Sequence, residues 1–313
     1  MPGYADYKKL YIEEYKTLFE EGYDVEKYIV DDENSELFAP NPKNSKDYPE
    51  GDDFWEKPYK NLIRIMDTSN FREGYPYVEP NGFEEIMEQA IKAPELLPLS
   101  DDEYEKRIKG AFSGRCASVI LGKPLEMGLS KDFIKKYLES VDAYPLNDFV
   151  PEYSEKLDYR LRGDCIYSTK GHVNFAQSDD DIHYTLLGLR LIEIFGFEIE
   201  PWKVLKNWAD NIPYLWCWCA SRVAYYHYVG GTLPLEKIPY TINPWRECID
   251  GQIRTDIWGY VFPANHKKAC ELAHKDTSAT LTKNGIYGGM FVAGALSCAL
   301  SQNPTVDRII DAG

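Results

Sequence analysis

The chain has 313 residues, of which 44% are hydrophobic, and its 35 basic against 51 acidic side chains give a formal net charge of −16 at pH 7. This hydrophobic fraction excludes global disorder, and the acidity excludes the basic footprint of a general nucleic-acid binder. The charge is compatible with a carboxylate metal site, although acidity more often serves solubility. No apolar run approaches the ~18 residues of a membrane span. No signal peptide is visible and the seven cysteines form no paired C-x-x-C motif, which predicts a cytoplasmic protein with free thiols and no membrane partner.

Residues 1–99 are predicted to form an N-terminal extension that is partly helical and partly irregular. Apolar residues recur at helical spacing over 5–21. The acidic, Pro- and Asn-rich stretch 31–80 predicts loops, although its apolar side chains from Phe54 to Ile65 require a packing partner. A short helix is expected over 83–93, with Asn81 and Glu84 in capping positions.

The character of the chain changes at Ser100, where Ser100 and Glu103 form a capping box at the start of a helix. That helix carries a stripe of small residues at every fourth position: Gly110, Gly114, Ser118 and Gly122. A second stripe lies in a late helix that is expected to begin near Tyr287: Gly289, Ala293, Ser297 and Ser301. We expect both stripes to face buried neighbours. Strand-like alternation is scarce, so residues 100–313 are predicted to be all-α, a compact orthogonal bundle of helices.

Three consecutive carboxylates, Asp179-Asp180-Asp181, stand directly before a strongly apolar helix over 182–195. Acidic residues in this position cap a helix and interact favourably with its positive end, so a purely structural role is one reading. The other reading is a metal site, because adjacent carboxylates repel and a hard divalent cation with oxygen ligands holds them together. The nearby His183 is more typical of a partly buried or surface histidine than of a ligand.

Three segments in order resemble the ADP-ribosylglycohydrolase family, which includes the dinitrogenase reductase-activating glycohydrolases. They are the run from Gly110 through the turn Gly122-Lys123-Pro124-Leu125-Glu126, the aspartates 179–181 with the helix after them, and the late segment 284–293. The resemblance covers about 210 residues, from Ser100 to the last residue. It implies a hydrolase that cleaves the bond between the ribose anomeric carbon of ADP-ribose and a side chain of a modified protein, or a related small-molecule adduct.

The resemblance also implies roles for individual residues. Asp180 and Asp181 match the family's early aspartate pair, and Asp179 stands at the family's threonine, which makes all three metal ligands and gives Asp180 a catalytic role. An offset alternative makes Ser178 the hydroxyl ligand and pairs Asp179 with Asp180. Family members commonly hold two Mg²⁺ ions, which orient the ribose and activate a water. Glu126 matches a glutamate close to the site and is assigned proton transfer, its alternative being a surface charge after a turn.

Substrate contacts are expected from a loop and from the late helix. The residues concerned are Gly251, Gln252, Arg254, Tyr287 and Gly288. This assignment also rests on the resemblance, because these positions correspond to a substrate-facing loop and to a helix of the larger bacterial members.

The sequence departs from the family pattern at three places, and these departures keep a second function open. The opening glycine stripe reads Ser118-Val119-Ile120 where the family usually has an aspartate, Thr280 is followed by Leu281 where a histidine is common, and no late Asp-x-Asp-Ser/Thr motif is present. The last helix also looks unfinished at Gly313, so we expect the second half of the metal site to lie in downstream sequence. The alternative is a non-catalytic binding or structural protein on the same scaffold.

Overall fold

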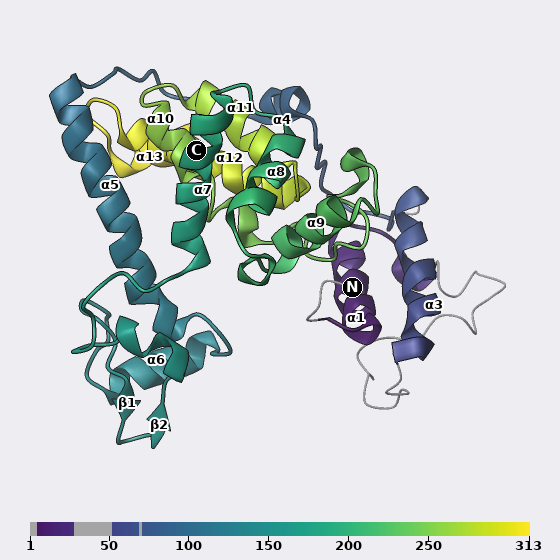
Figure 1. Ribbon diagram of the computed structural model, residues 1–313, viewed down its shortest axis with the longest axis horizontal. Coiled ribbons are helices and arrows are strands. Elements are labelled where there is room, and N and C mark those ends of the chain that lie inside the picture. The colour runs from purple at the N-terminus through teal and green to yellow at the C-terminus, as the bar shows by residue number, and fades with distance from the viewer. Residues whose placement is uncertain (1–4, 28–51, 69–70) are drawn as a thin grey trace. The chain divides into compact units, whose positions relative to one another are not determined.

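The computed structural model describes residues 5–27, 52–68 and 71–313 (Figure 1), and the prediction of loops over 31–51 lies outside these residues. Within the described ranges the secondary structure is almost entirely helical. The sheet found there is one antiparallel pair of two-residue strands, β1 (Tyr153–Ser154) and β2 (Tyr159–Arg160). The all-α prediction is therefore confirmed. Of the helices described, none is both long enough and apolar enough to cross a bilayer.

The chain divides into two compact units, residues 1–98 with 187–313 (unit 1) and residues 99–186 (unit 2). The expected division into an extension, 1–99, and a helical domain, 100–313, stays a prediction, and in the structure residues 187–313 group with the N-terminal extension. Unit 1 contains α1 (Tyr7–Glu20), α3 (Asp52–Leu62), η3 (Ile63–Asp67), α4 (Phe83–Gln89), α8 (Pro201–Asn211), η6 (Tyr214–Trp216), α9 (Cys219–Gly230), η7 (Leu235–Lys237), η8 (Ile249–Gly251), α10 (Asp256–Val261), α11 (His266–Thr277), α12 (Lys283–Ala299) and α13 (Val306–Ala312). Unit 2 contains α5 (Asp101–Gly122), η4 (Lys123–Leu125), α6 (Lys131–Ser140), β1, β2 and η5 (Gly163–Ser168), and α7 (Asp180–Phe195) begins in it.

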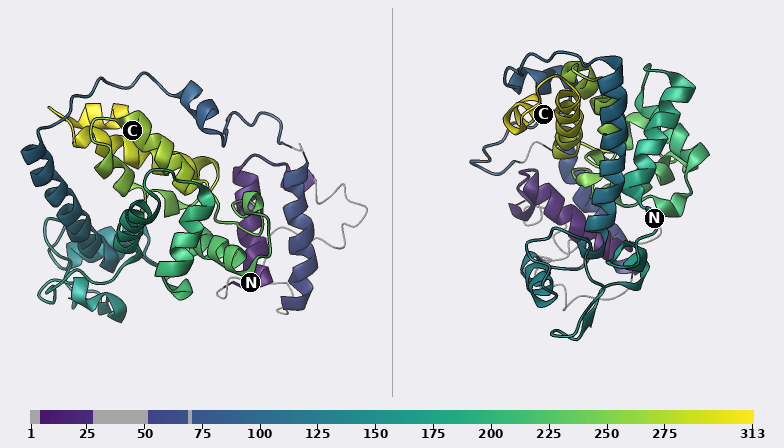
Figure 2. Two further views of the ribbon diagram at one scale, coloured as in Figure 1. Left: turned by 45° about the horizontal axis from the view of Figure 1, so that its top comes forward. Right: turned by 90° about the vertical axis from the view of Figure 1, so that its left-hand side faces the viewer.

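The N-terminal extension is more helical than its composition predicts. Residues 52–62 form α3, which lies beside α1 (Figure 1 and the left view of Figure 2), so the prediction of loops is wrong there. Pro58 inside a helix costs about 3 kcal/mol. Burial of Trp55, Tyr59 and Leu62, each worth about 1.5–3 kcal/mol, outweighs that cost. Burial of these apolar side chains therefore determines the local structure. Helix α1 is the packing partner that they require.

Helix α12 is the buried centre of unit 1, and it begins at Lys283, four residues earlier than expected. It carries one charged residue in 17, which is typical of a helix surrounded by protein. Its stripe of small residues meets close neighbours, as expected. A Cβ added at Gly289 would lie 2.6 Å from Thr277 Cγ2, and the backbone of α10 approaches Ala293 so closely that a Cβ at Gly259 would lie 2.8 Å from the Ala293 carbonyl.

The stripe on α5 differs from its expectation. The predicted capping box is present, with the Ser100 hydroxyl accepting from the Glu103 N–H. However, a Cβ added at Gly110, Gly114 or Gly122 would meet no described atom within 4 Å. The prediction of buried neighbours for this stripe is therefore wrong within unit 2. Seven of the eight charged residues of α5 lie in its first nine positions, which suits contact with water at that end of the helix.

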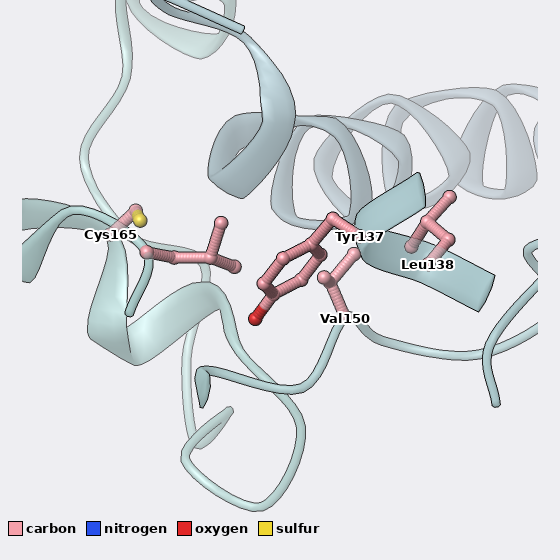
Figure 3. Packing of buried hydrophobic residues seen from close by; sticks show 5 residues of the cluster. Tyr137, Leu138, Val150 and Cys165 are labelled. Atoms are coloured by element: carbon pink, nitrogen blue, oxygen red, sulfur yellow. The ribbon is translucent and has the colours of Figure 1, made fainter. Parts of the chain in front are cut away.

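Unit 2 has a small core of its own, built on α6 and on the segments before β1 and after β2. Tyr137, Leu138, Val150 and Cys165 are packed together there (Figure 3). The hydroxyl of Tyr137 donates to the Pro151 carbonyl at 2.6 Å. This core anchors the long connection from α6 to α7, and it therefore helps to position the aspartates at the start of α7.

Candidate metal centre

The aspartate cluster (Asp179, Asp180, Asp181) lies where α7 begins. Asp180 and Asp181 occupy the first turn of the helix, and Asp179 precedes it. The Asp179 side chain accepts from the Asp181 N–H at 3.2 Å, and its carbonyl accepts from the His183 N–H at 3.1 Å. Asp179 thus satisfies helix N–H groups that would otherwise lack partners, as a capping residue does. The structural role expected for the triplet falls mainly on Asp179.

Two cations lie beside the cluster, and sequence reasoning missed both. The Lys123 ammonium contacts Asp179 Oδ2 at 2.5 Å and the Ser178 carbonyl at 3.1 Å. The Arg115 Nε donates to the Asp181 carbonyl at 3.1 Å, and its guanidinium lies 3.9 Å from the Asp181 carboxylate. Lys123 belongs to the same Gly-Lys-Pro turn that leads to Glu126, and its position in that turn was the available signal.

The carboxylates of the cluster remain crowded in spite of these cations. One oxygen from each of the three aspartates lies within 4.8 Å of the others. Burial, together with the charges of Asp179 and Asp181, raises the pKa of Asp180 to about 7. Burial and the charge of Asp179 likewise raise the pKa of Asp181 to about 6, although Arg115 opposes the shift. A divalent cation is the ordinary means of stabilising such a group in its ionised form.

Glu126 lies in the same unit and belongs to the electrostatic surroundings of the cluster. It is exposed and follows η4 directly. Its negative charge contributes to the raised pKa of both Asp180 and Asp181. This places a fourth carboxylate near the cluster, on a short turn after α5. His183 contacts the residue before the cluster, with its Nε2 3.1 Å from the Ser178 hydroxyl.

The donor set fits a hard divalent cation. It consists of carboxylate oxygens alone, with ligand atoms close enough to share one ion. Asp180 and Asp181 suit that role best, because Asp179 is already engaged by Lys123 and by the helix N–H groups. In the offset alternative, with Ser178 as a ligand, the Ser178 hydroxyl could donate to His183 Nε2 and still offer a lone pair to the ion.

The residues expected to contact substrate form a second group, in unit 1. The η8 segment approaches α12 so closely that a Cβ at Gly251 would lie 2.2 Å from the Gly285 carbonyl oxygen. A Cβ at Gly288 would likewise lie 2.6 Å from Gln252 Nε2. Gln252 is exposed and Tyr287 is half-buried. Gly251, Gln252 and Gly288 therefore meet where η8 packs on the first turns of α12, and Tyr287 precedes Gly288 on that helix.

Arg254, the fifth, has a different environment. Its side chain is 2% exposed, and its guanidinium donates to Asp276 Oδ1 at 2.9 Å and to Thr280 Oγ1 at 2.9 Å. It also donates to two carbonyls at the end of α11 and lies 5.0 Å from the ring centroid of Trp208. These bonds tie the loop after η8 to α11. In this structure Arg254 supports the loop that carries Gln252.

Comparison with known proteins gives one match. A family model described as ADP-ribosylglycohydrolase matches residues 100–313, which is 214 of the 313 residues. No curated protein and no solved structure matches significantly.

Proposed function

The chain belongs to the ADP-ribosylglycohydrolase family, and from this premise we propose that it hydrolyses the N- or O-glycosidic bond of an ADP-ribose adduct in a reaction that depends on Mg²⁺. The family acts on ADP-ribosylated substrates and is generally metal-dependent. The observation that supports a catalytic rather than a structural role here is the aspartate cluster, in which capping engages Asp179 and leaves two further carboxylates with raised pKa values.

Asp180 and Asp181 are proposed to hold the cation. Magnesium is favoured because all the available ligands are oxygens and because Mg²⁺ is commonly bound by one or two carboxylates together with substrate oxygens. When bound, the cation supplies Lewis acidity toward the ribose oxygens and makes a water more nucleophilic. Arg115 holds the backbone of Asp181 in place, and Lys123 fixes the position of Asp179.

Glu126 is proposed to move the proton of the reaction. An exposed carboxylate on a turn near the cluster can accept a proton from the attacking water and return it to the leaving group. The ADP-ribose moiety is proposed to contact Gln252, Tyr287 and the backbone at Gly251 and Gly288, while Arg254 supports the loop. A reducing, cytoplasmic setting is also part of the proposal.

The test is release of ADP-ribose from a panel of peptides ADP-ribosylated on arginine or on serine, measured by chromatography with EDTA or with added Mg²⁺. We expect Mg²⁺-dependent release, lowered at least ~100-fold in Glu126→Gln, since general acid–base catalysis contributes about 10²–10⁴-fold. Glu155→Gln removes an exposed carboxylate from the same unit and should leave the rate unchanged. Equal rates in EDTA and in Mg²⁺ would contradict the proposed metal dependence.

The ion pair between Lys123 and Asp179 favours one alternative, a non-catalytic binding protein on the same scaffold. A lysine close to the cluster supplies part of the positive charge that a metal would otherwise bring. A protein that binds ADP-ribose in calorimetry and cleaves no peptide of the panel would establish this alternative.

A further inference from the structure

The N-terminal extension lies outside the matched family region, yet in unit 1 it is bonded directly to the start of α12. The segment concerned, Glu79–Asn81, is called the strap. The Asn81 Oδ1 accepts from the backbone N–H of Lys283 at 2.8 Å, and the Asn81 carbonyl lies 2.8 Å from His274 Nε2. The Pro80 carbonyl accepts from the Tyr287 hydroxyl at 2.5 Å. The strap therefore bonds the first and fifth residues of α12.

Lys283, whose backbone N–H is bonded by the strap, has an unusual backbone conformation. Its φ is +43°, in the left-handed region that non-glycine residues rarely adopt. Such a conformation persists only where the surroundings fix it, and here they do so at two points. Asn81 accepts from the Lys283 N–H, and the Lys283 ammonium lies 3.8 Å from a carboxylate oxygen of Glu79. The start of α12 is thus held in place by residues of the extension.

A buried cluster behind Lys283 anchors the extension as a whole. Arg246 donates to both oxygens of Glu21, at 2.8 and 2.6 Å, and to Glu14 at 2.6 Å, and all three side chains are at most 3% exposed. The Arg246 carbonyl in turn accepts from the Thr282 N–H at 2.8 Å. Helix α1 is therefore connected through one arginine to the residue before Lys283.

These contacts bear on substrate binding because α12 carries Tyr287 and Gly288 in its second turn. The Tyr287 hydroxyl has one proton, and it gives that proton to Pro80. Toward a ligand it can then offer only a lone pair, so the ligand group it suits is a hydrogen-bond donor. Ribose hydroxyls and the adenine amino group are such donors.

We propose that the strap is a positioning element of the substrate-binding face, which sets the first turns of α12 so that Tyr287 accepts a hydrogen bond from the ADP-ribose moiety. This inference rests on the proposed function for its ligand. Glu79, Pro80 and Asn81 act through α12, and none of them is assigned contact with the reacting atoms.

The test compares Asn81→Ala, which removes the acceptor for the Lys283 N–H, with Asn81→Asp, which keeps it. We measure KM and kcat for an ADP-ribosylated peptide and the Kd of free ADP-ribose. In Asn81→Ala both KM and Kd should rise about fivefold to tenfold, the effect of one hydrogen bond on an equilibrium, with kcat unchanged. Asn81→Asp should restore both constants. The matched control is Gln89→Ala, which removes an exposed amide from the same extension and should change neither.

The inference is overturned if Asn81→Ala leaves KM and Kd unchanged, if it lowers kcat alone, or if Asn81→Asp is equally defective. If Asn81→Ala does not fold, Tyr287→Phe carries the test, because it removes the bond to Pro80 and the acceptor oxygen together. It should then raise Kd, and an unchanged Kd overturns the inference. Wild-type protein that binds ADP-ribose in the predicted manner without cleaving any peptide supports the inference and contradicts the proposed function. Wild-type protein that neither cleaves nor binds overturns both.

Discussion

Each unit contains one group of charged residues. The two groups have the same numbers of acids and bases but arrange them differently. The aspartate cluster with Glu126 has four carboxylates beside two cations, Lys123 and Arg115. The group around Arg246, called the arginine cluster, also has two cations, Arg246 and Lys283. Its four carboxylates are Glu14, Glu21, Glu79 and Glu247.

In the arginine cluster the cations lie at the centre. Arg246 is buried between Glu14 and Glu21, and the remaining excess of negative charge is relieved by a hydrogen bond between Glu21 and Glu247. In the aspartate cluster the cations bond the outer residues, and the pKa of Asp180 stays raised to about 7. The difference teaches that an excess of carboxylates alone does not mark a metal site. Each cluster keeps one carboxyl with a pKa raised to about 7, so what distinguishes the aspartate cluster is that three carboxylates offer oxygens within 4.8 Å of one another, close enough to share one ion.

The largest expected effect comes from removing the central cation of the arginine cluster. Arg246→Met would leave Glu14 and Glu21 buried without their partner, which should lower the free energy of unfolding by about 3–5 kcal/mol. Urea denaturation measures this change. As a control, Arg190→Met breaks an exposed pair with Glu193 and should cost less than about 1 kcal/mol. Equal costs for the two variants would show that the arginine cluster is not the anchor described.

Adding a cation should stabilise the aspartate cluster and not the arginine cluster. At a Mg²⁺ concentration of 100 times Kd, binding to the folded state alone raises the free energy of unfolding by about 2.7 kcal/mol. We therefore expect Tm to increase with Mg²⁺ and to return when EDTA is added. Asp180→Asn should abolish the increase, whereas Asp142→Asn, at an exposed aspartate of the same unit, should retain it. If the Tm of the wild type does not change with Mg²⁺, the aspartate cluster, like the arginine cluster, has a structural role only.

A proton held by Glu247 in the arginine cluster should make the free energy of unfolding depend on pH. Burial and the hydrogen bond with Glu21 raise the pKa of Glu247 to about 7, while Lys283 and Asn284 oppose the shift. The other titratable groups whose charges interact with Glu247 are Tyr75, Tyr287 and Cys248. Because the folded state holds this proton more tightly than the unfolded state, its contribution is complete below pH ~4.5 and is lost as pH rises through ~7.

The measurement is the difference in unfolding free energy between wild type and Glu247→Gln at several pH values. That difference should move against the wild type by roughly 2 kcal/mol between pH 5 and pH 8. Glu236→Gln, at an exposed glutamate of η7, controls for the loss of one charge. A difference that stays constant over this range would mean that Glu247 holds no such proton.

The smallest effects are expected at the two stripes of small residues. The stripe on α12 has close neighbours, whereas the stripe on α5 has none among the described atoms. Gly114→Ala on α5 meets no described atom and should stabilise by up to about 1 kcal/mol, because alanine favours the helix. Gly289→Ala on α12 places a Cβ 2.6 Å from Thr277 Cγ2 and should destabilise by about 1–2 kcal/mol. Thermal unfolding compares the two, and destabilisation by both would mean that α5 also has a close neighbour.

The sequence predicted features that depend on neighbouring residues. The capping box at Ser100, the aspartates at the start of α7 and the all-α class are each written in a few consecutive side chains or in their spacing. The stripe on α5 was misread for the same reason. Spacing indicates that a backbone could approach, whereas the tertiary fold determines whether one does.

Features assembled from distant segments were not predictable. The bond between Arg246 and Glu14 joins residues 232 positions apart, and the strap meets α12 across 202 positions. Asn81 illustrates the difference. Its sequence context predicts a cap for α4, but Gly82 occupies the N-cap and the Asn81 side chain bonds Lys283 instead. A partner supplied by the tertiary fold replaced the local one.

The central claim is that the aspartate cluster holds the cation on which glycosidic cleavage depends. The most direct measurement is the rate of ADP-ribose release against free Mg²⁺ concentration, for wild type, Asp180→Asn and Asp142→Asn. The account predicts a saturable rise for wild type and Asp142→Asn, and no saturation over the same range for Asp180→Asn. Superimposable curves for wild type and Asp180→Asn would contradict it.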